Sequence, residues 1–317
     1  MTTNILKAEF IEEDYISAVE TMISTSSYGR HKKFMEISRI SQDRERELGY
    51  DGVLTSIVPF YLQFKRSSFY TPAFNGKLSS DRKQVFKQAF DKGFLGFSLH
   101  KDRNTGGYDQ HNAIWELSKK SSAAYVAPLF YKSRNLTSLK RNEVNIPWNY
   151  IRQNVKDRAY RKDYLLQAIR TFRDSIVIVP HREVKDKGAS HHYTYDKAMN
   201  CLAFHSEVEE LEGLPRDLLE FLGELIDRTL ETESREDISL SVLQTLPKLF
   251  GFTWSSRKFR TMLSHYLREV GLMANTLPRD AFAFLAKELD MSDRYFLLET
   301  FLKEELDIIQ YTIRINA

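Results

Sequence analysis

The residues whose types and spacing could support chemistry are concentrated in one short segment of the chain. Gln63 and Lys65 stand two positions apart in an apolar, aromatic run, and side chains two apart on a strand project from the same face. Asp51 lies in a shorter apolar run just before it, and Glu45 and Glu47 end the preceding predicted helix. If the two runs pair as neighbouring strands, Asp51 lies beside that face and the helix adds a further carboxylate.

This group of side chains suits the hydrolysis of phosphodiesters. Asp51, a glutamate and the amide oxygen of Gln63 are oxygen ligands of the kind that Mg²⁺ prefers. A metal bound there polarises a phosphate and lowers the pKa of a bound water. Lys65 can hold that water or offset the negative charge that develops on the phosphate. The segment therefore predicts a site for Mg²⁺ (or Mn²⁺) that acts on phosphodiester bonds.

Helices and strands alternate along the first two thirds of the chain, and these elements must position the site. Some segments carry apolar residues at helical spacing, whereas others are short, β-branched and aromatic. Helices are predicted over residues 8–23, 31–48, 80–92, 110–122 and 158–172. Strands are predicted over residues 49–55, 57–65, 94–100, 123–131, 175–180, 191–196 and 200–206.

The pattern changes near residue 211. Beyond it strand signals vanish, and helices are predicted near residues 215–231, 237–248, 256–271, 278–289 and 292–310. We therefore expect an α/β protein with a mixed sheet flanked by helices in residues 1–210 and an all-helical C-terminal domain in residues 211–317. That helical region either packs on itself or provides a surface for a homo-oligomer or another protein partner, and the sequence leaves both open.

The arrangement Glu-x-x-x-Asp…Gln-x-Lys across a helix and two strands resembles that of the PD-(D/E)xK nuclease superfamily. The phrases GYDGVL and YLQFK look like its Mrr-type restriction-endonuclease and Holliday-junction-resolvase branches, in which glutamine often replaces the second acidic residue. The resemblance covers residues 36–131, extends to about residue 210 and leaves the C-terminal third without an account. It implies a restriction-endonuclease-like fold and a metal-dependent DNA endonuclease.

The resemblance also implies a role for each residue of the motif. Asp51 corresponds to the metal-bridging aspartate, Gln63 to the second ligand and Lys65 to the catalytic lysine. Glu47, or alternatively Glu45, corresponds to the glutamate of the first helix. The implied catalytic set is therefore Glu47, Asp51, Gln63 and Lys65. A weaker likeness to nuclease-like proteins of bacterial defence systems implies a role against phage.

The distribution of charge favours a nucleic-acid partner for the N-terminal part. The net charge is only +3, but residues 211–317 hold 13 Lys and Arg against 18 Asp and Glu, which leaves 33 against 25 in residues 1–210. The balances are thus −5 and +8, and a basic surface attracts a phosphate backbone. DNA is favoured over RNA. The candidate nucleic-acid-binding residues are Lys33, Arg46, Arg66, Gln110 and His111.

Each of these patterns also has a purely structural interpretation. Gln63 and Lys65 could occupy the solvent-facing side of an edge strand, and the charged run around Glu45 and Glu47 could be a solvated helix end. His111 stands at a predicted helix start, where it could be an ordinary polar residue. The alternative function is accordingly a catalytically inactive scaffold that binds nucleic acid or protein with the same fold.

Other classes of protein are excluded by what the sequence lacks. With Cys201 as the single cysteine, neither an intramolecular disulfide nor a cysteine-rich zinc site is possible. There is no P-loop, dinucleotide-binding or H-E-x-x-H motif. The N-terminus lacks the apolar run of a signal peptide, and no stretch approaches 18 uncharged apolar residues. We therefore expect a cytoplasmic protein that does not engage a membrane.

Overall fold

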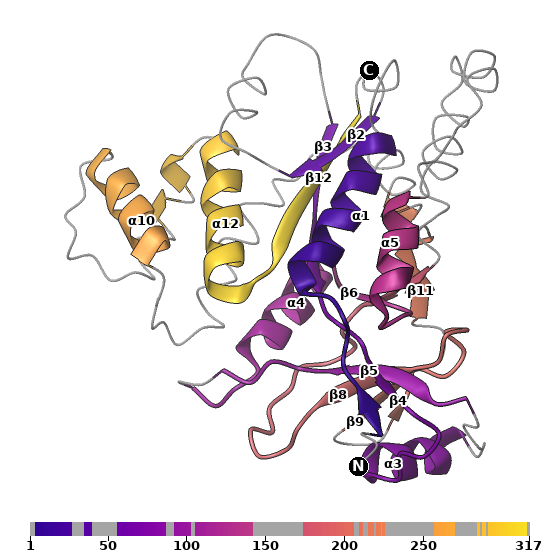
Figure 1. The fold of residues 1–317 in the computed structure, drawn as a ribbon. Helices are drawn as coiled ribbons and strands as arrows, with labels where there is room; N and C mark the ends of the chain where they lie inside the picture. The colour runs from indigo at the N-terminus through magenta and orange to yellow at the C-terminus, as the bar shows by residue number, and fades with distance from the viewer. Residues whose placement is uncertain are drawn as a thin grey trace, which may run out of the picture.

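The structure is a computed structural model of the 317-residue chain, and its described residues form an α/β fold built on two six-stranded sheets (Figure 1). No helix among these residues has the length and apolar character needed to cross a membrane. The described residues are 4–26, 35–39, 56–86, 92–102, 105–141, 174–205, 209–211, 215–218, 220–222, 224–225, 257–269, 284–285, 287–289 and 291–315.

One sheet is antiparallel throughout and lies in the lower part of Figure 1. Its central strands carry aromatic and small residues that pack on both faces, as expected of strands buried on either side. Its strands, in spatial order, are β1 (Ile5–Leu6), β4 (Ser68–Tyr70), β5 (Phe94–Ser98), β8 (His192–Tyr195), β9 (Ala203–His205) and β10 (Glu209–Glu210).

The second sheet is mixed and carries the strand with the Gln-x-Lys motif. Its strands, in spatial order, are β11 (Pro215–Asp217), β7 (Ser175–Ile178), β6 (Ser122–Pro128), β3 (Ser56–Phe64), β12 (Ile309–Ile315) and β2 (Met35–Arg39). The pair β3 and β6 is parallel, and the other neighbours are antiparallel. A parallel pair needs a crossover connection, and here it ends with a helix that leads directly into β6.

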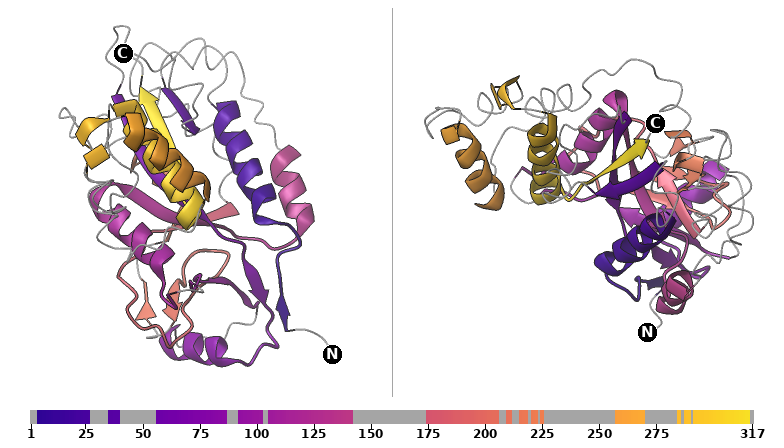
Figure 2. Two further views of the ribbon diagram at one scale, coloured as in Figure 1. Left: turned by 90° about the vertical axis from the view of Figure 1, so that its left-hand side faces the viewer. Right: turned by 90° about the horizontal axis from the view of Figure 1, so that it is seen from above.

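Helices cover both faces of the mixed sheet, as the two views of Figure 2 show. One face carries α1 and α5, and the other carries α4 and α12, with α10 packed beyond α12. A further helix, α3, lies beside the antiparallel sheet. The helices are α1 (Glu12–Ser26), α3 (Lys77–Phe86), α4 (Asp109–Lys120), α5 (Ser133–Arg141), α10 (Arg257–Glu269) and α12 (Met291–Leu306).

The alternation of side chains along β3 explains these two layers. Phe60, Leu62 and Phe64 join the core beneath α1, whereas Tyr61 joins the core beneath α4 and α12. The period of two along a strand sends alternate side chains to opposite faces. Gln63 therefore lies on the same face as Tyr61, as the sequence pattern predicts, and there it is a buried polar side chain beneath α4 and α12.

Two expectations about secondary structure are wrong. Residues 31–48 were expected to be helical, yet residues 35–39 form β2. The C-terminal third is not all-helical, because it contributes β11 and β12. The alternating sequence from residue 308 to 315 is strand-like, but the preceding helical periodicity masks the change of period. The division at residue 210 stays a prediction, although β12 hydrogen-bonds β2 and β3 from the N-terminal part.

Most other predicted elements are confirmed. The strands β3, β5, β6, β7, β8 and β9 and the helices α1, α3, α4, α10 and α12 all fall within predicted segments or one to three residues beyond them. Three predicted elements, over residues 49–55, 158–172 and 237–248, lie outside the described residues. The neighbours of β3 in the described sheet are β12 and β6.

Candidate active site at the end of β3

Lys65 stands immediately after β3, at the carboxyl end of the parallel pair. Its backbone N–H donates to the carbonyl of Val126 at 2.9 Å, which continues the pairing with β6 by one residue. Its ammonium donates to Oε1 of Gln110, in the first turn of α4, at 3.1 Å. Burial lowers the pKa of Lys65, while the carboxylates of Glu12 and Asp307 act in the opposite direction. The lysine is thus partly desolvated and faces two acids.

Two glutamine side chains fasten this strand end to the last turn of α12. The amide nitrogen of Gln110 donates to the carbonyl of Leu306 at 2.5 Å, and that of Gln63 donates to the same carbonyl at 3.3 Å. The last carbonyls of a helix have no partner within the helix, so these amides satisfy one of them. The Oε1 atom of Gln63 is buried and has no hydrogen-bond partner among the described residues. A buried oxygen in that state is available to a ligand.

Asp307 connects α12 to β12 and brings its carboxylate to this strand end. Its φ of 53° lies in the left-handed region, which is common for the residue that follows a helix. Its N–H donates to the carbonyl of Lys303 at 3.2 Å, as in a left-handed helix cap. In the register of β12 on β3, Ile309 lies opposite Leu62. Asp307 therefore lies level with the end of β3.

The electrostatics of Asp307 and Glu12 tie both residues to Lys65. Burial raises the pKa of Asp307, Lys65 lowers it, and Glu13 raises it. Burial likewise raises the pKa of Glu12, the first residue of α1, and there Lys65 opposes burial while Asp307 adds to it. Two acids and one lysine thus lie within electrostatic reach of one another, each partly desolvated. Such mutual shifts are typical of active sites, although structural ion pairs also produce them.

The structure brings together some of the predicted site residues. Gln63, Lys65 and Gln110 converge as described above. Arg66 is exposed next to them, and its guanidinium donates to the carbonyl of Phe10 at 3.4 Å. The other predicted residues lie outside the described residues, so their positions stay predictions. These are Lys33, Glu45, Arg46, Glu47 and Asp51.

His111 has a different place from the one predicted for it. It is 1% exposed, with Nδ1 3.0 Å from the hydroxyl of Tyr125 and Nε2 3.0 Å from the carbonyl of Arg182. Burial lowers its pKa to about 4, so the ring is neutral at pH 7. A ring held in this way cannot reach a phosphate on the surface, so a direct contact with nucleic acid is not supported.

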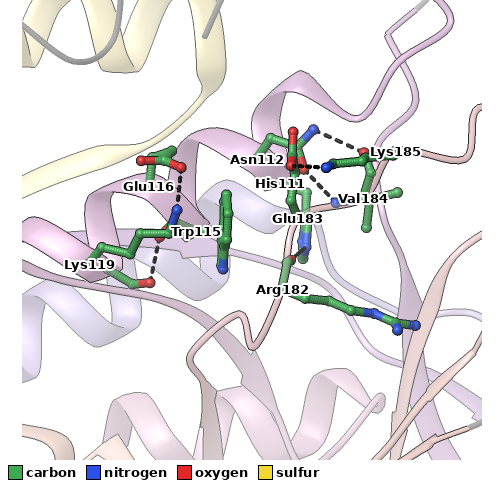
Figure 3. Close-up of polar contacts among 10 residues, drawn as sticks. His111, Asn112, Trp115, Glu116, Lys119, Arg182, Glu183, Val184 and Lys185 are labelled. Carbon is green, nitrogen blue, oxygen red and sulfur yellow. Dashed lines mark hydrogen bonds and ion pairs between the residues drawn. The ribbon is translucent and has the colours of Figure 1, made fainter.

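The neighbour of His111 on α4 shows what this part of the helix does. Asn112 donates to the carbonyl of Val184 at 3.0 Å and accepts from the N–H of Val184 at 2.8 Å, so its amide pairs with that residue as a strand would (Figure 3). Together with His111, it anchors the segment around residues 182–185 on α4. The start of α4 therefore has two sides, one that holds this loop and one, at Gln110, that faces Lys65.

Sequence reasoning missed Glu12 and Asp307. Glu12 belongs to an acidic first turn, Glu12 to Asp14, and acids in that place are common because they complement the helix dipole. Asp307 fell inside a predicted helix that ran to residue 310. The change from helical spacing to the alternating pattern after residue 307 was the signal that could have placed a helix end there.

The donor atoms at this site suit a hard cation in kind. Glu12, Asp307 and the unpartnered Oε1 of Gln63 are all oxygen donors, which Mg²⁺ prefers. Within the described residues, however, no group of three or more His, Cys, Asp or Glu side chains is arranged to hold a metal ion. A complete carboxylate set would need Asp51 or Glu47, which lie outside the described part of the chain.

Comparisons with known proteins identify no relative. No protein-family description, no curated protein and no solved structure matches the chain. The function must therefore be argued from the residues at the end of β3.

Proposed function

We propose that the protein is a metal-dependent nuclease that hydrolyses phosphodiester bonds of DNA. One observation carries the proposal, the meeting of Lys65 with Glu12, Asp307 and the unpartnered Oε1 of Gln63 at the end of β3. This is the chemistry of the Gln-x-Lys motif, with carboxylates contributed by two segments far apart in the sequence. A restriction-endonuclease-like core, and a role in defence against phage, belong to the same proposal.

The residues at the end of β3 would have distinct roles in binding metal and in activating water. Glu12, Asp307 and Gln63 would hold Mg²⁺ or Mn²⁺, together with Asp51 and Glu47 (or Glu45) from the predicted motif. The metal, when bound, supplies Lewis-acid activation of a phosphate and of a water. Lys65 would orient the attacking water and offset charge that develops on the phosphate.

Gln110 would act as a positioning residue. It accepts a hydrogen bond from the Lys65 ammonium and donates one to the carbonyl of Leu306. A lysine on a flexible stem loses much of its rotational freedom when it is held in this way. Gln110 therefore fixes the ammonium beside the two carboxylates without itself contacting the reacting atoms.

Metal dependence is the first test. Purified protein should nick plasmid DNA or cut single-stranded DNA with Mg²⁺ or Mn²⁺, and a chelator should stop the reaction. Lys65→Met should lower the rate at least about a hundredfold. The matched control is Lys83→Met, an exposed lysine on α3, which should leave the rate unchanged. No cleavage by the wild-type protein with any divalent metal, or full activity of Lys65→Met, would overturn the proposal.

A second candidate function is favoured by the two glutamines. Both amide nitrogens donate to the carbonyl of Leu306, so the network also works as a clamp on the end of α12. In that case the fold would be an inactive scaffold that binds nucleic acid or a protein, with the C-terminal region serving assembly. Tight binding of DNA without cleavage under every metal condition would favour this candidate.

A further inference from the structure

Two loops near the candidate active site each carry an exposed lysine, and backbone carbonyls of these loops hold both ammonium groups. One loop follows β5 and includes His100 and Lys101, and the other precedes β8 and includes Lys187. The ammonium of Lys101 donates to the backbone carbonyl of Lys187, and that of Lys187 donates to the carbonyl of Thr105 at 3.3 Å. We call His100, Lys101 and Lys187 the basic strip.

Hydrogen bonds connect the two loops that carry the basic strip. The N–H of Leu99 donates to the carbonyl of His191 at 2.9 Å, and the hydroxyl of Tyr108 donates to the carbonyl of Ala189 at 2.5 Å. Each lysine side chain is thus held by a hydrogen bond from its ammonium to a backbone carbonyl. A lysine ammonium has three N–H donors. With one N–H of each ammonium used by a carbonyl, two on each remain for a ligand.

The acids on these loops are engaged elsewhere. Oδ1 of Asp102 accepts the N–H of Thr105 at 2.8 Å, and Oδ1 of Asp186 accepts the N–H of Gly188 at 2.7 Å. Within the described residues, neither Lys101 nor Lys187 forms an ion pair with a carboxylate. Both side chains and His100 are exposed. Exposed ammonium groups without a carboxylate partner attract a polyanion, and here Asp102 and Asp186, which keep their charges, bond backbone N–H groups instead of these lysines.

A third lysine on the same loop shows that this arrangement is specific. Lys185 lies 3.4 Å from Oε2 of Glu183, and the pair is drawn in Figure 3. Lys185 is 82% exposed, so it is accessible yet already neutralised. The loop therefore presents one paired lysine and one unpaired lysine two residues apart.

The basic strip begins next to the candidate active site. β4 begins three residues after Lys65, and its antiparallel pairing with β5 sets Ser68 opposite Gly96, so the chain that leaves β5 toward His100 runs back toward the end of β3. Lys101 follows directly, and Lys187 lies beside it through the carbonyl bond. Two ammonium groups thus follow His100 on the side where the phosphodiester would be cut.

We propose that the basic strip binds the phosphates of the nucleic-acid substrate next to the bond that is hydrolysed, an inference that rests on the proposed function. Lysine contacts of this kind carry no base information, so the strip would hold DNA of any sequence. Binding through it should release counterions and weaken as salt rises.

The test measures binding without cleavage. Fluorescently labelled DNA, as a duplex and as a single strand, and RNA of the same sequence are titrated in chelator at several salt concentrations. Each of Lys101→Gln and Lys187→Gln should weaken binding about fivefold to tenfold, and the double variant should lower the salt slope by about two. Lys185→Gln, the matched control, should bind within about twofold of wild type because that lysine is already paired.

The outcomes separate this inference from the nuclease proposal. Wild-type binding by the double variant, or an equal loss in Lys185→Gln, would overturn the inference. Equal competition by polyglutamate would also overturn it, because the strip would then be a general polyanion site. A wild-type protein that binds DNA through the strip but never cuts it would refute the nuclease proposal alone.

Discussion

Two regions of the molecule hold partly or fully buried charged groups, and these groups differ in the contacts that they make. In the antiparallel sheet, the guanidinium of Arg82 is fully buried, donates to Oγ1 of Thr194 at 2.7 Å and to the carbonyl of Cys201 at 3.0 Å, and stacks over Phe86 and Phe94. At the end of β3, by contrast, Lys65 lies near two acids with raised pKa values, and the buried amide oxygen of Gln63 has no hydrogen-bond partner in the described part of the chain.

The network around Arg82 continues in a directed chain. Nε2 of His205 lies 2.7 Å from Oγ1 of Thr194, and Nδ1 lies 3.4 Å from Oδ2 of Asp81. With the proton on Nδ1, the Thr194 hydroxyl accepts from Arg82 and donates to His205, which in turn donates to Asp81. The order resembles a hydroxyl, imidazole and carboxylate triad, but Thr194 is fully buried and its oxygen is occupied by Arg82.

This difference between the Arg82 network and the end of β3 indicates a structural role for the first and a functional role for the second. A buried network whose residues hydrogen-bond one another stiffens a core. A group of acids that burial and like charge both disfavour contributes little to stability, and such groups are retained where a ligand needs them. Four experiments test this contrast.

The largest effect on stability should come from Arg82. Arg82→Leu removes two hydrogen bonds from a charged donor and leaves Thr194 without one partner, so the free energy of unfolding should fall by about 3 kcal/mol. The measurement is urea denaturation followed by circular dichroism. Lys83→Leu, the next and exposed position on α3, should stay within about 0.5 kcal/mol of wild type. A loss below about 1 kcal/mol in Arg82→Leu would contradict the structural role.

The largest effect on activity without loss of stability should come from Glu12. Glu12→Gln keeps the shape of the side chain but removes the charge, and cleavage should fall about a hundredfold if this carboxylate holds the metal. Its raised pKa means that the fold gains nothing from the ionised form, so the midpoint of unfolding should not fall. Asp14→Asn, at an exposed position of the same turn, is the control. Equal rates for both variants and wild type would remove Glu12 from the site.

The two regions should also differ in the sign of their pH dependence. Burial lowers the pKa of His205 from 6.5 to about 4, so the unfolded chain binds a proton at pH values where the folded chain does not. Stability from His205 is therefore present above pH 6.5 and falls as the pH drops toward 4, by up to about 3 kcal/mol. Glu12 and Asp307, with raised pKa values, act in the other direction and disfavour the fold as they ionise.

Urea denaturation between pH 8 and pH 4.5 measures this difference. The His205→Gln variant should be less stable at pH 8, because its hydrogen bonds are weaker, but it should lose less stability on acidification than wild type. His111→Gln should flatten the same curve, since burial also lowers the pKa of His111 to about 4. Parallel curves for wild type and both variants would show that neither histidine is responsible.

The sequence predicted the strand that carries the site better than the acids around it. Phe60, Leu62 and Phe64 alternate with Tyr61 and Gln63, and that period indicates both the strand and a polar position on one of its faces. Lys65 lies beside Gln110 because the parallel pairing of β3 with β6 brings the end of β3 next to the start of α4, and the sequence did not predict that pairing.

Long-range pairing is what the sequence could not reveal. Nothing local in residues 309–315 indicates that they insert between β2 and β3, since any exposed edge with the same alternation would accept them. The recruitment of Asp307 depends wholly on that insertion. Similarly, the sequence of β11 is typical of a helix start, and it forms a strand because it pairs with β7.

The smallest effect should come from Asp307, and its sign is the informative part. The residue holds a left-handed backbone conformation directly after α12, where asparagine or glycine is better suited. Its negative charge also lies at the helix C-terminus, where the helix dipole disfavours anions. Asp307→Asn should therefore raise the free energy of unfolding at pH 7 by about 0.5–1 kcal/mol, measured by urea denaturation.

The same substitution should abolish cleavage if Asp307 belongs to the active site. Asp307→Gly separates the two effects, since glycine also relieves the backbone conformation but removes the polar side chain altogether. A gain of stability in both variants together with loss of activity would mean that the fold keeps a carboxylate where its own stability disfavours one. A loss of stability in Asp307→Asn would instead make Asp307 part of a structural ion pair with Lys65, and the contrast between the two regions would disappear.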